Sequence, residues 1–180
     1  ISVIDPATNK VVKTIYVGGS PENVFLSKYG YKYVAYKSSI KVFNQSWQKI
    51  GTFSFYCLNS IVLDPNTGLL YVEYTTSIGA TCLVSYNGTK VVQEVGDPST
   101  LTLLLFAGKN HIYGVAAPVG GIYEFNPYNL SSYTCIPVQH MPLFYVTTYA
   151  DGVIYDYCES AQPYTNIWVI NVNGSAYILS

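Results

Sequence analysis

Few residues in this chain could do acid–base or metal chemistry. Its 180 residues include 10 Asp and Glu residues and two His residues. Glu94 and Asp97 flank Gly96 and could offer oxygens to a cation, although two carboxylates at this spacing are a weak signal. His140 precedes Met141-Pro142 and is the best candidate for a functional histidine. No nucleophile, zincin or phosphate-loop motif is present, so the sequence predicts no catalytic residue, metal or cofactor.

Other titratable residues have a structural interpretation. Asp64 begins Asp-Pro-Asn-Thr-Gly and Asp151 is followed by Gly, which are turn-forming sequences. His111 stands alone at the start of a Tyr-rich strand, where we expect a hydrogen-bonded structural role.

Four cysteines lie far apart in the chain: Cys57, Cys82, Cys135 and Cys158. None belongs to a CxxC motif or lies near a paired His, which argues against zinc. In an exported protein an even number of cysteines predicts two disulfides, with three pairings open.

Four Asn-x-Ser/Thr sequons predict glycosylation, each in a turn that follows a hydrophobic strand: Asn44, Asn87, Asn129 and Asn173. Together with the cysteines, the low charge and the many Tyr, Thr and Ser residues, they favour an extracellular, cell-surface or virion-surface location. The first residue is Ile1, and we expect the chain to be a segment of a longer protein.

The composition excludes two classes of protein. The net charge is −1 and no basic run is present, which argues against nucleic-acid binding. Apolar runs are much shorter than the roughly 20 residues that a membrane span needs, so we expect no such span. Only 11% of residues are charged, whereas 19 are Tyr.

A repeat organises the whole chain. Five short hydrophobic strands end in Asp5, Asn44, Asn87, Asn126 and Asn171, at intervals of 39, 43, 39 and 45 residues. Between them recur a turn and a Tyr-rich strand, as in Tyr31–Tyr36. A period of about 40 residues with four strands per repeat is typical of a β-propeller. We therefore predict one all-β domain over residues 1–180, with repeat units at about 1–39, 40–82, 83–121, 122–166 and 167–180.

The predicted strands do not divide evenly into blades. With strands A to D numbered from the propeller axis outward, the pattern gives five C–D hairpins and four A–B hairpins. This predicts about four complete blades plus one half blade, in a four- or five-bladed propeller of four-stranded antiparallel blades. The half blade at the N-terminus could receive strands that precede Ile1, pack outside the ring, or accept a strand from another subunit.

The first repeat resembles the YVTN-type propeller repeat. The matching residues are Ser2-Val3-Ile4-Asp5, Thr8-Asn9, Val11-Val12, Thr14-Ile15, Val17-Gly18, Pro21 and Tyr33-Val34. The match is specific in this first unit and weakens afterwards. The resemblance covers roughly the first 75 residues in motif and the whole chain in period. The resemblance implies a propeller like those of archaeal and bacterial surface proteins, or a relative of lactonase-like propeller enzymes. The scarcity of carboxylates also suits a hot, acidic habitat, since little charge pairing is lost in acid.

The sequence is compatible with two functions. The first is a non-enzymatic propeller for recognition, adhesion or assembly in a cell-surface layer, an extracellular filament or a viral attachment component. Its partner would be a protein or glycan on a cell or particle surface, or another copy bound through the incomplete first blade. Tyr side chains suit such surfaces because they combine a large ring with a polar tip. The alternative is a lactonase-like hydrolase with its site at the channel mouth, near Glu94, Asp97 and His140.

Overall fold

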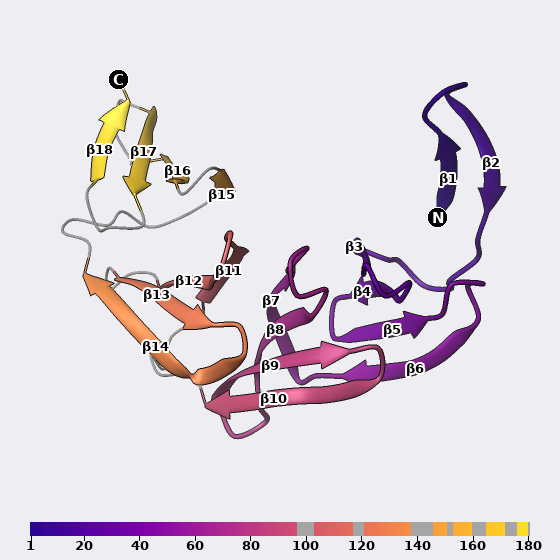
Figure 1. Ribbon diagram of the computed structural model, residues 1–180, viewed down its shortest axis with the longest axis horizontal. Coiled ribbons are helices and arrows are strands. Elements are labelled where there is room, and N and C mark those ends of the chain that lie inside the picture. The colour runs from indigo at the N-terminus through magenta and orange to yellow at the C-terminus, as the bar shows by residue number, and fades with distance from the viewer. Residues whose placement is uncertain are drawn as a thin grey trace.

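The computed structural model is all-β (Figure 1). The structure describes residues 1–96, 103–116, 121–137, 146–150, 153–159, 165–171 and 176–179. These residues form strands β1 to β18 and the turns between them, with no helix among them. Accordingly, no helix in this described part is long and apolar enough to cross a membrane.

The strands form one two-stranded sheet and four four-stranded sheets, all antiparallel. The N-terminal hairpin pairs β1 (Ser2–Asp5) with β2 (Lys10–Thr14). The first four-stranded sheet contains β3 (Asn23–Leu26), β4 (Lys32–Tyr36), β5 (Ser39–Phe43) and β6 (Lys49–Ser54). The second contains β7 (Cys57–Leu63), β8 (Leu70–Thr75), β9 (Thr81–Asn87) and β10 (Lys90–Gly96).

The last two sheets repeat the same plan. The third contains β11 (Leu103–Ala107), β12 (Ile112–Ala116), β13 (Gly121–Asn126) and β14 (Asn129–Pro137). The fourth contains β15 (Val146–Ala150), β16 (Val153–Glu159), β17 (Thr165–Asn171) and β18 (Ala176–Leu179). In every four-stranded sheet the strands pair in chain order, as short antiparallel connections dictate.

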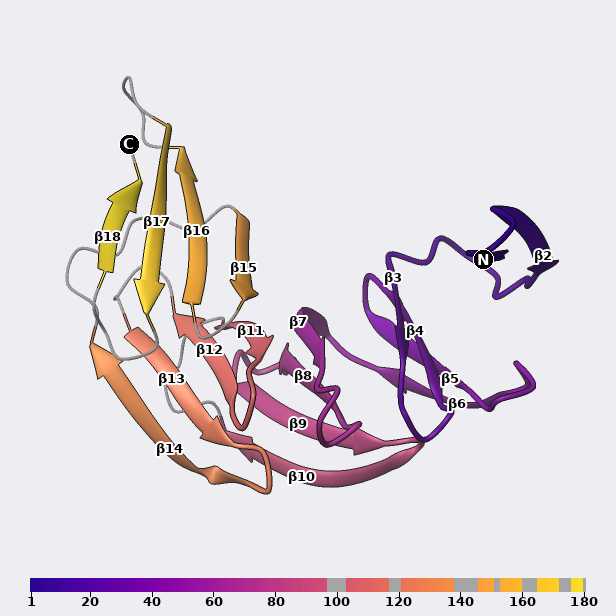
Figure 2. The same ribbon diagram turned by 45° about the horizontal axis from the view of Figure 1, so that its top comes forward.

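This arrangement agrees with the strands expected from the repeat. Each four-stranded sheet is one A–B–C–D set. The two-stranded N-terminal sheet is a C–D pair, and no described A–B pair lies beside it. The predicted repeat units begin at a C strand, so each of them spans the end of one sheet and the start of the next. Figure 2 shows the sheets following one another along a curve, with their first strands on the inner side.

The core lies between successive sheets, because alternate side chains of each middle strand point to opposite neighbours. Tyr33 and Ala35 of β4 face the second sheet, where they meet Leu70 and Val72 of β8. Val34, between them in sequence, joins a cluster with Ile15 and Val17 on the other side. Tyr71 and Leu83 of the second sheet in turn meet the third, at Leu105, Ile112, Phe125 and Leu130. Burial on both faces explains why these strands are continuously apolar.

A buried tyrosine hydroxyl links each of the first two four-stranded sheets to the sheet that follows it. Tyr33 pairs with the residue two positions before Asn44, and Tyr71 with the residue two positions before Asn87, so they occupy equivalent places. The Tyr33 hydroxyl accepts a hydrogen bond from the Gly88 N–H at 2.7 Å. The Tyr71 hydroxyl donates to the Pro127 carbonyl at 3.0 Å. Gly88 and Pro127 each follow the Asn that ends the C strand of the next sheet, so the two links are structurally the same.

The environment of these two hydroxyls keeps them protonated. Both tyrosine side chains are fully buried. Burial disfavours the phenolate and raises the pKa of Tyr33 and of Tyr71 to about 12. Each hydroxyl therefore remains a neutral hydrogen-bonding group at any physiological pH.

Further side-chain bonds join the sheets at the A–B turns. Ser27 Oγ donates to the Gly68 carbonyl at 2.8 Å, from the first turn to the second. Asn66 Nδ2 donates to the Lys109 carbonyl at 2.9 Å, from the second turn to the third. In the first three four-stranded sheets the A–B and C–D turns lie at the same end, so these bonds and the tyrosine links stabilise one face of this part of the molecule.

We predict that Tyr33→Phe destabilises the protein more than Tyr71→Phe does. Tyr33→Phe leaves the buried Gly88 N–H without a partner, which costs about 1–3 kcal/mol. In Tyr71→Phe the Pro127 carbonyl still accepts from Gln93 Nε2 at 3.4 Å, so we expect a loss nearer about 1 kcal/mol. Denaturant unfolding of both variants measures the difference. Tyr16→Phe is the control, because Tyr16 is 94% exposed and should change nothing. Equal stability of all three variants would contradict the proposed role.

Candidate functional site

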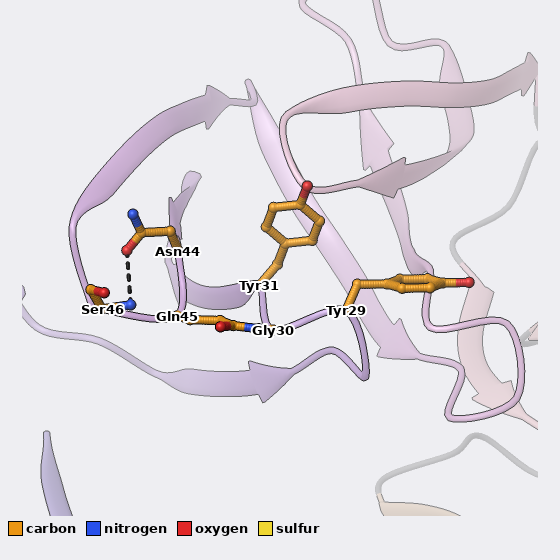
Figure 3. A pocket seen from close by; sticks show the side chains of 6 residues that line it. All are labelled: Tyr29, Gly30, Tyr31, Asn44, Gln45 and Ser46. Carbon is orange, nitrogen blue, oxygen red and sulfur yellow. Dashed lines mark hydrogen bonds between the residues drawn. The ribbon is translucent and has the colours of Figure 1, made fainter.

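A pocket of about 340 Å³ opens at the turn end of the first four-stranded sheet (Figure 3). Tyr29, Gly30 and Tyr31 line it from the β3–β4 turn, and Asn44, Gln45 and Ser46 line it from the β5–β6 turn. These turns are neighbours because β4 and β5 are paired along their whole length. The volume lies at the lower end of the range for small-ligand sites.

The β5–β6 turn is held by the side chain of Asn44. Its Oδ1 accepts from the N–H groups of Ser46 and Gln48, each at 3.0 Å. Its Nδ2 donates to Gln48 Oε1 at 2.9 Å. An Asn side chain that bonds its own turn in this way fixes the backbone locally.

Trp47 in this turn has an unusual backbone conformation. Its φ is +64°, in the left-handed region that bulky residues rarely adopt. Its N–H donates to the Asn44 carbonyl at 3.0 Å, and its ring lies 5.9 Å from that of Phe43. Backbone strain of this kind persists only where surrounding contacts stabilise it, and it is concentrated at functional sites.

Lys32 connects both turns from behind the pocket. Its Nζ donates to the carbonyls of Gln45 at 2.9 Å, Asn44 at 3.1 Å and Gly30 at 3.4 Å. The same ammonium lies 5.2 Å from the centre of the Trp47 ring. One cation therefore holds the two walls together and stabilises the strained turn.

Two tyrosines form the aromatic wall. Tyr31 packs against Gly88 of the second sheet, where an added Cβ would lie 2.6 Å from the Tyr31 Cζ. Tyr29 is 50% exposed, and Lys28 Nζ lies 5.3 Å from its ring centre. The Gln45 carboxamide lies against Gly30, whose φ of +84° and lack of a Cβ make room for it, and the Tyr29 ring points away from Gln45 on the other side of Gly30 (Figure 3). The pocket thus combines aromatic surface with amide and hydroxyl groups.

Of the three residues predicted for a channel-mouth site, only Glu94 lies in the described part of the chain. Glu94 lies within β10, the outer strand of its sheet, and its carboxylate accepts a hydrogen bond from the Tyr74 hydroxyl. Burial and this carboxylate raise the pKa of Tyr74. Asp97 and His140 lie outside the described residues. Among the described residues, no group of three or more His, Cys, Asp or Glu side chains could hold a metal.

The structural interpretations of Asp64 and His111 fit their surroundings. The buried Asp64 carboxylate accepts from the N–H groups of Asn66 and Thr67 and from the Thr67 hydroxyl, at 2.6 to 3.1 Å. His111 Nδ1 lies 3.3 Å from Glu124 Oε1 within the third sheet. Asp151 lies outside the described residues.

The described sequons lie in C–D turns, as expected, but their side chains differ in access. Asn129, at the start of β14, is exposed. Asn44 Nδ2, the atom that would carry a glycan, is engaged with Gln48. Asn87 is half-buried, and its Oδ1 is buried without a hydrogen-bond partner. Asn173 lies outside the described residues. The geometry therefore favours Asn129 among the described three.

The expected disulfides are not supported by the structure. Cys57, Cys82 and Cys135 are free thiols, and the side chain of Cys158 lies outside the described part. Cys57 pairs with Thr75 of β8, and Cys82 pairs with Tyr74 on the other edge of β8, so a whole strand separates the two cysteines. Strands two places apart are about 10 Å from each other, beyond the Cα separation of a disulfide. Cys135 belongs to the next sheet.

Sequence reasoning missed a buried glutamate. Glu73 of β8 is fully buried, and its Oε1 accepts from Asn59 Nδ2 at 3.0 Å. Asn59 Nδ2 also donates to the Thr75 hydroxyl, and its Oδ1 accepts from the exposed Cys57 thiol at 3.2 Å. A Glu inside the apolar run Leu-Tyr-Val-Glu-Tyr was the available signal, because such a strand is buried on both faces. This cluster lies in the second four-stranded sheet, at the end away from its A–B turn.

We predict that Lys32→Met opens the pocket turns and destabilises the protein by about 1–3 kcal/mol, because three carbonyls lose a charged donor. Trp47 should become more exposed, with a red shift of its fluorescence. Lys37→Met is the matched control, since Lys37 is exposed in the β4–β5 turn. Unchanged stability and fluorescence in Lys32→Met would show that the turns do not depend on this cation.

No family model and no curated protein matches the sequence. Solved structures match the fold at low identity. Dihydro-heme d1 dehydrogenase NirN in complex with DHE superposes with a TM-score of 0.69, at 9% identity, covering 98% of this chain and 40% of that chain. BamB from Moraxella catarrhalis gives 0.56, at 7% identity, covering 86% of this chain and 46% of that chain.

A chain of a nidogen/laminin complex gives a TM-score of 0.58, at 16% identity, covering 86% of this chain and 60% of that chain. This chain therefore spans 40% to 60% of the length of these three. All three are propeller-fold proteins. At such identities the likeness concerns the fold alone: this chain has four-stranded antiparallel sheets arranged as in a β-propeller.

Proposed function

We propose that this chain is a non-enzymatic β-propeller displayed outside the cell, or on a virion, where it recognises a surface ligand. The observation that carries the proposal is the pocket between the two turns of the first sheet. Its walls are fixed before any ligand arrives, by the Asn44 turn and by Lys32. Preorganised walls reduce the entropy lost on binding. Aromatic, amide and hydroxyl groups suit recognition better than proton transfer.

The extracellular part of the proposal draws on the sequence and on the turns. The C–D turns carry the sequons, and Asn129 is exposed there. Within the proposed ring the four complete sheets are four blades, and β1–β2 is a half blade of a four- or five-bladed propeller. The YVTN-type resemblance of the first repeat supports the same assignment to surface proteins.

Surface labelling tests the location directly. Intact cells or particles that carry the chain are treated with a biotinylation reagent that cannot cross membranes and reacts with lysine amines. We expect labelling without lysis at exposed lysines such as Lys10, Lys13 and Lys49, and slower labelling at Lys32, which is engaged with three carbonyls. A cytosolic protein of the same cells is the control. Labelling that requires lysis would contradict surface display.

The open edge of β1 supports assembly as a second candidate function. Ile1 and Ile15 exchange both backbone hydrogen bonds, so the N–H and C=O of the next residue, Ser2, point away from β2. In every other sheet the corresponding strand is paired on this side. Ile4, Val11 and Val12 on the same hairpin are more than half exposed. A strand added here by a second copy would complete the pairing.

Sedimentation velocity over a range of concentrations tests this candidate. We expect a concentration-dependent oligomer that Ser2→Pro disrupts, because Pro removes an edge N–H that an added strand needs. Ser2→Ala is the matched control and should assemble normally, since it keeps the N–H. A monomer at all concentrations, or an oligomer insensitive to Ser2→Pro, would exclude assembly through β1.

A further inference from the structure

The side chains that line the pocket limit the classes of ligand that it can bind. None of its six lining residues carries a carboxylate, an ammonium or a guanidinium group. The two nearest ammonium groups are already engaged, since Lys32 Nζ donates to three turn carbonyls and Lys28 Nζ donates to the Asn66 carbonyl. A cationic ligand would therefore find no opposite charge among the lining residues, and an anionic ligand would have to compete with the turn carbonyls for the hydrogens of these ammonium groups.

The groups that remain available are aromatic rings and neutral polar atoms. Asn44 uses its amide to hold the turn. The Gln45 carboxamide and the Ser46 hydroxyl make no hydrogen bond to a described residue, so they can bind a ligand. A carboxamide offers donors and an acceptor together, which matches neighbouring hydroxyl groups on one molecule.

The aromatic wall is rigid on one side and accessible on the other. Tyr31 is fixed by its packing on Gly88 of the second sheet. Tyr29 is held at its ring by Lys28 but remains half exposed. Because a tyrosine ring is large and has few rotatable bonds, it gives contact area at little entropic cost. The C–H face of a sugar ring packs well on such a surface.

We propose that this pocket binds an uncharged oligosaccharide, with one sugar ring packed against the half-exposed Tyr29 and a hydroxyl of the neighbouring sugar hydrogen-bonded to Gln45. The inference deepens the proposed recognition function and rests on it. It assigns the ligand class to the turn face of the propeller, at the A–B and C–D turns of the first four-stranded sheet.

Saturation-transfer NMR and calorimetric titration with defined sugars test the proposal. The probes are neutral disaccharides (maltose, cellobiose, lactose and N,N′-diacetylchitobiose) and two charged ones (sialyllactose and a sulfated heparin disaccharide). We expect at least one neutral sugar to bind, and to bind more tightly than either charged sugar. Binding of charged sugars alone, or of none of the six, would overturn the saccharide assignment while leaving the surface-labelling result intact.

Variants then locate the bound sugar. Tyr29→Ala and Gln45→Ala should each weaken binding roughly three- to tenfold, the range expected for one aromatic or hydrogen-bonding contact. Tyr29→Phe keeps the ring and should bind nearly as well as the natural chain. Tyr16→Ala removes a tyrosine that is 94% exposed and does not line the pocket, and should change nothing. Circular dichroism checks that each variant is folded. Sugar binding that survives both Tyr29→Ala and Gln45→Ala would place the site elsewhere and overturn the proposal.

Discussion

The arrangement of the first three four-stranded sheets depends on buried hydrogen bonds between a tyrosine of one sheet and the backbone of the next. Apolar packing brings successive sheets together but is non-directional, so it does not by itself fix how far one sheet slides along its neighbour. Tyr33 and Tyr71 provide that positional control, because each hydroxyl meets a single backbone group at the following C–D turn. Gly88 has a backbone N–H, and the Tyr33 hydroxyl accepts a hydrogen bond from it. Pro127 has no N–H, and the Tyr71 hydroxyl instead donates a hydrogen bond to its carbonyl.

This link also places the candidate site. The interaction of Tyr33 with Gly88 sets the second sheet's turn close to the first sheet's turns, and the Tyr31 ring fills the space against Gly88. The pocket then lies where an aromatic A–B turn faces an amide-rich C–D turn. In the second sheet the equivalent A–B turn has the Asp64 and Thr67 network instead of tyrosines. The same framework thus carries different turn chemistry in successive repeats.

The repeat and its turn residues were enough to predict the strands, their order in each sheet and the incomplete N-terminal hairpin. These features are local, because alternation and turn type act over a few residues. The separation of Cys57 from Cys82 could not be predicted, because it depends on the pairing of both their strands with β8. The pocket could not be predicted either. Tyr29 and Tyr31 belong to a tyrosine cluster that the sequence shows. The left-handed backbone of Trp47 and the three hydrogen bonds of Lys32, however, arise from contacts between two turns. The burial of Glu73 follows from the burial of β8 on both faces, which the apolar neighbours of Glu73 in the sequence indicate.

Hydrogen exchange of the Gly88 amide, followed by NMR, tests the central claim most directly. Gly88 lies in a turn, where an amide without a partner exchanges quickly. If the Tyr33 hydroxyl accepts its hydrogen bond, Gly88 should be protected as strongly as the paired amides of β9, and Tyr33→Phe should remove this protection selectively. Fast exchange of Gly88 in the natural chain, or protection unchanged in Tyr33→Phe, would contradict the account of how successive sheets are held in place.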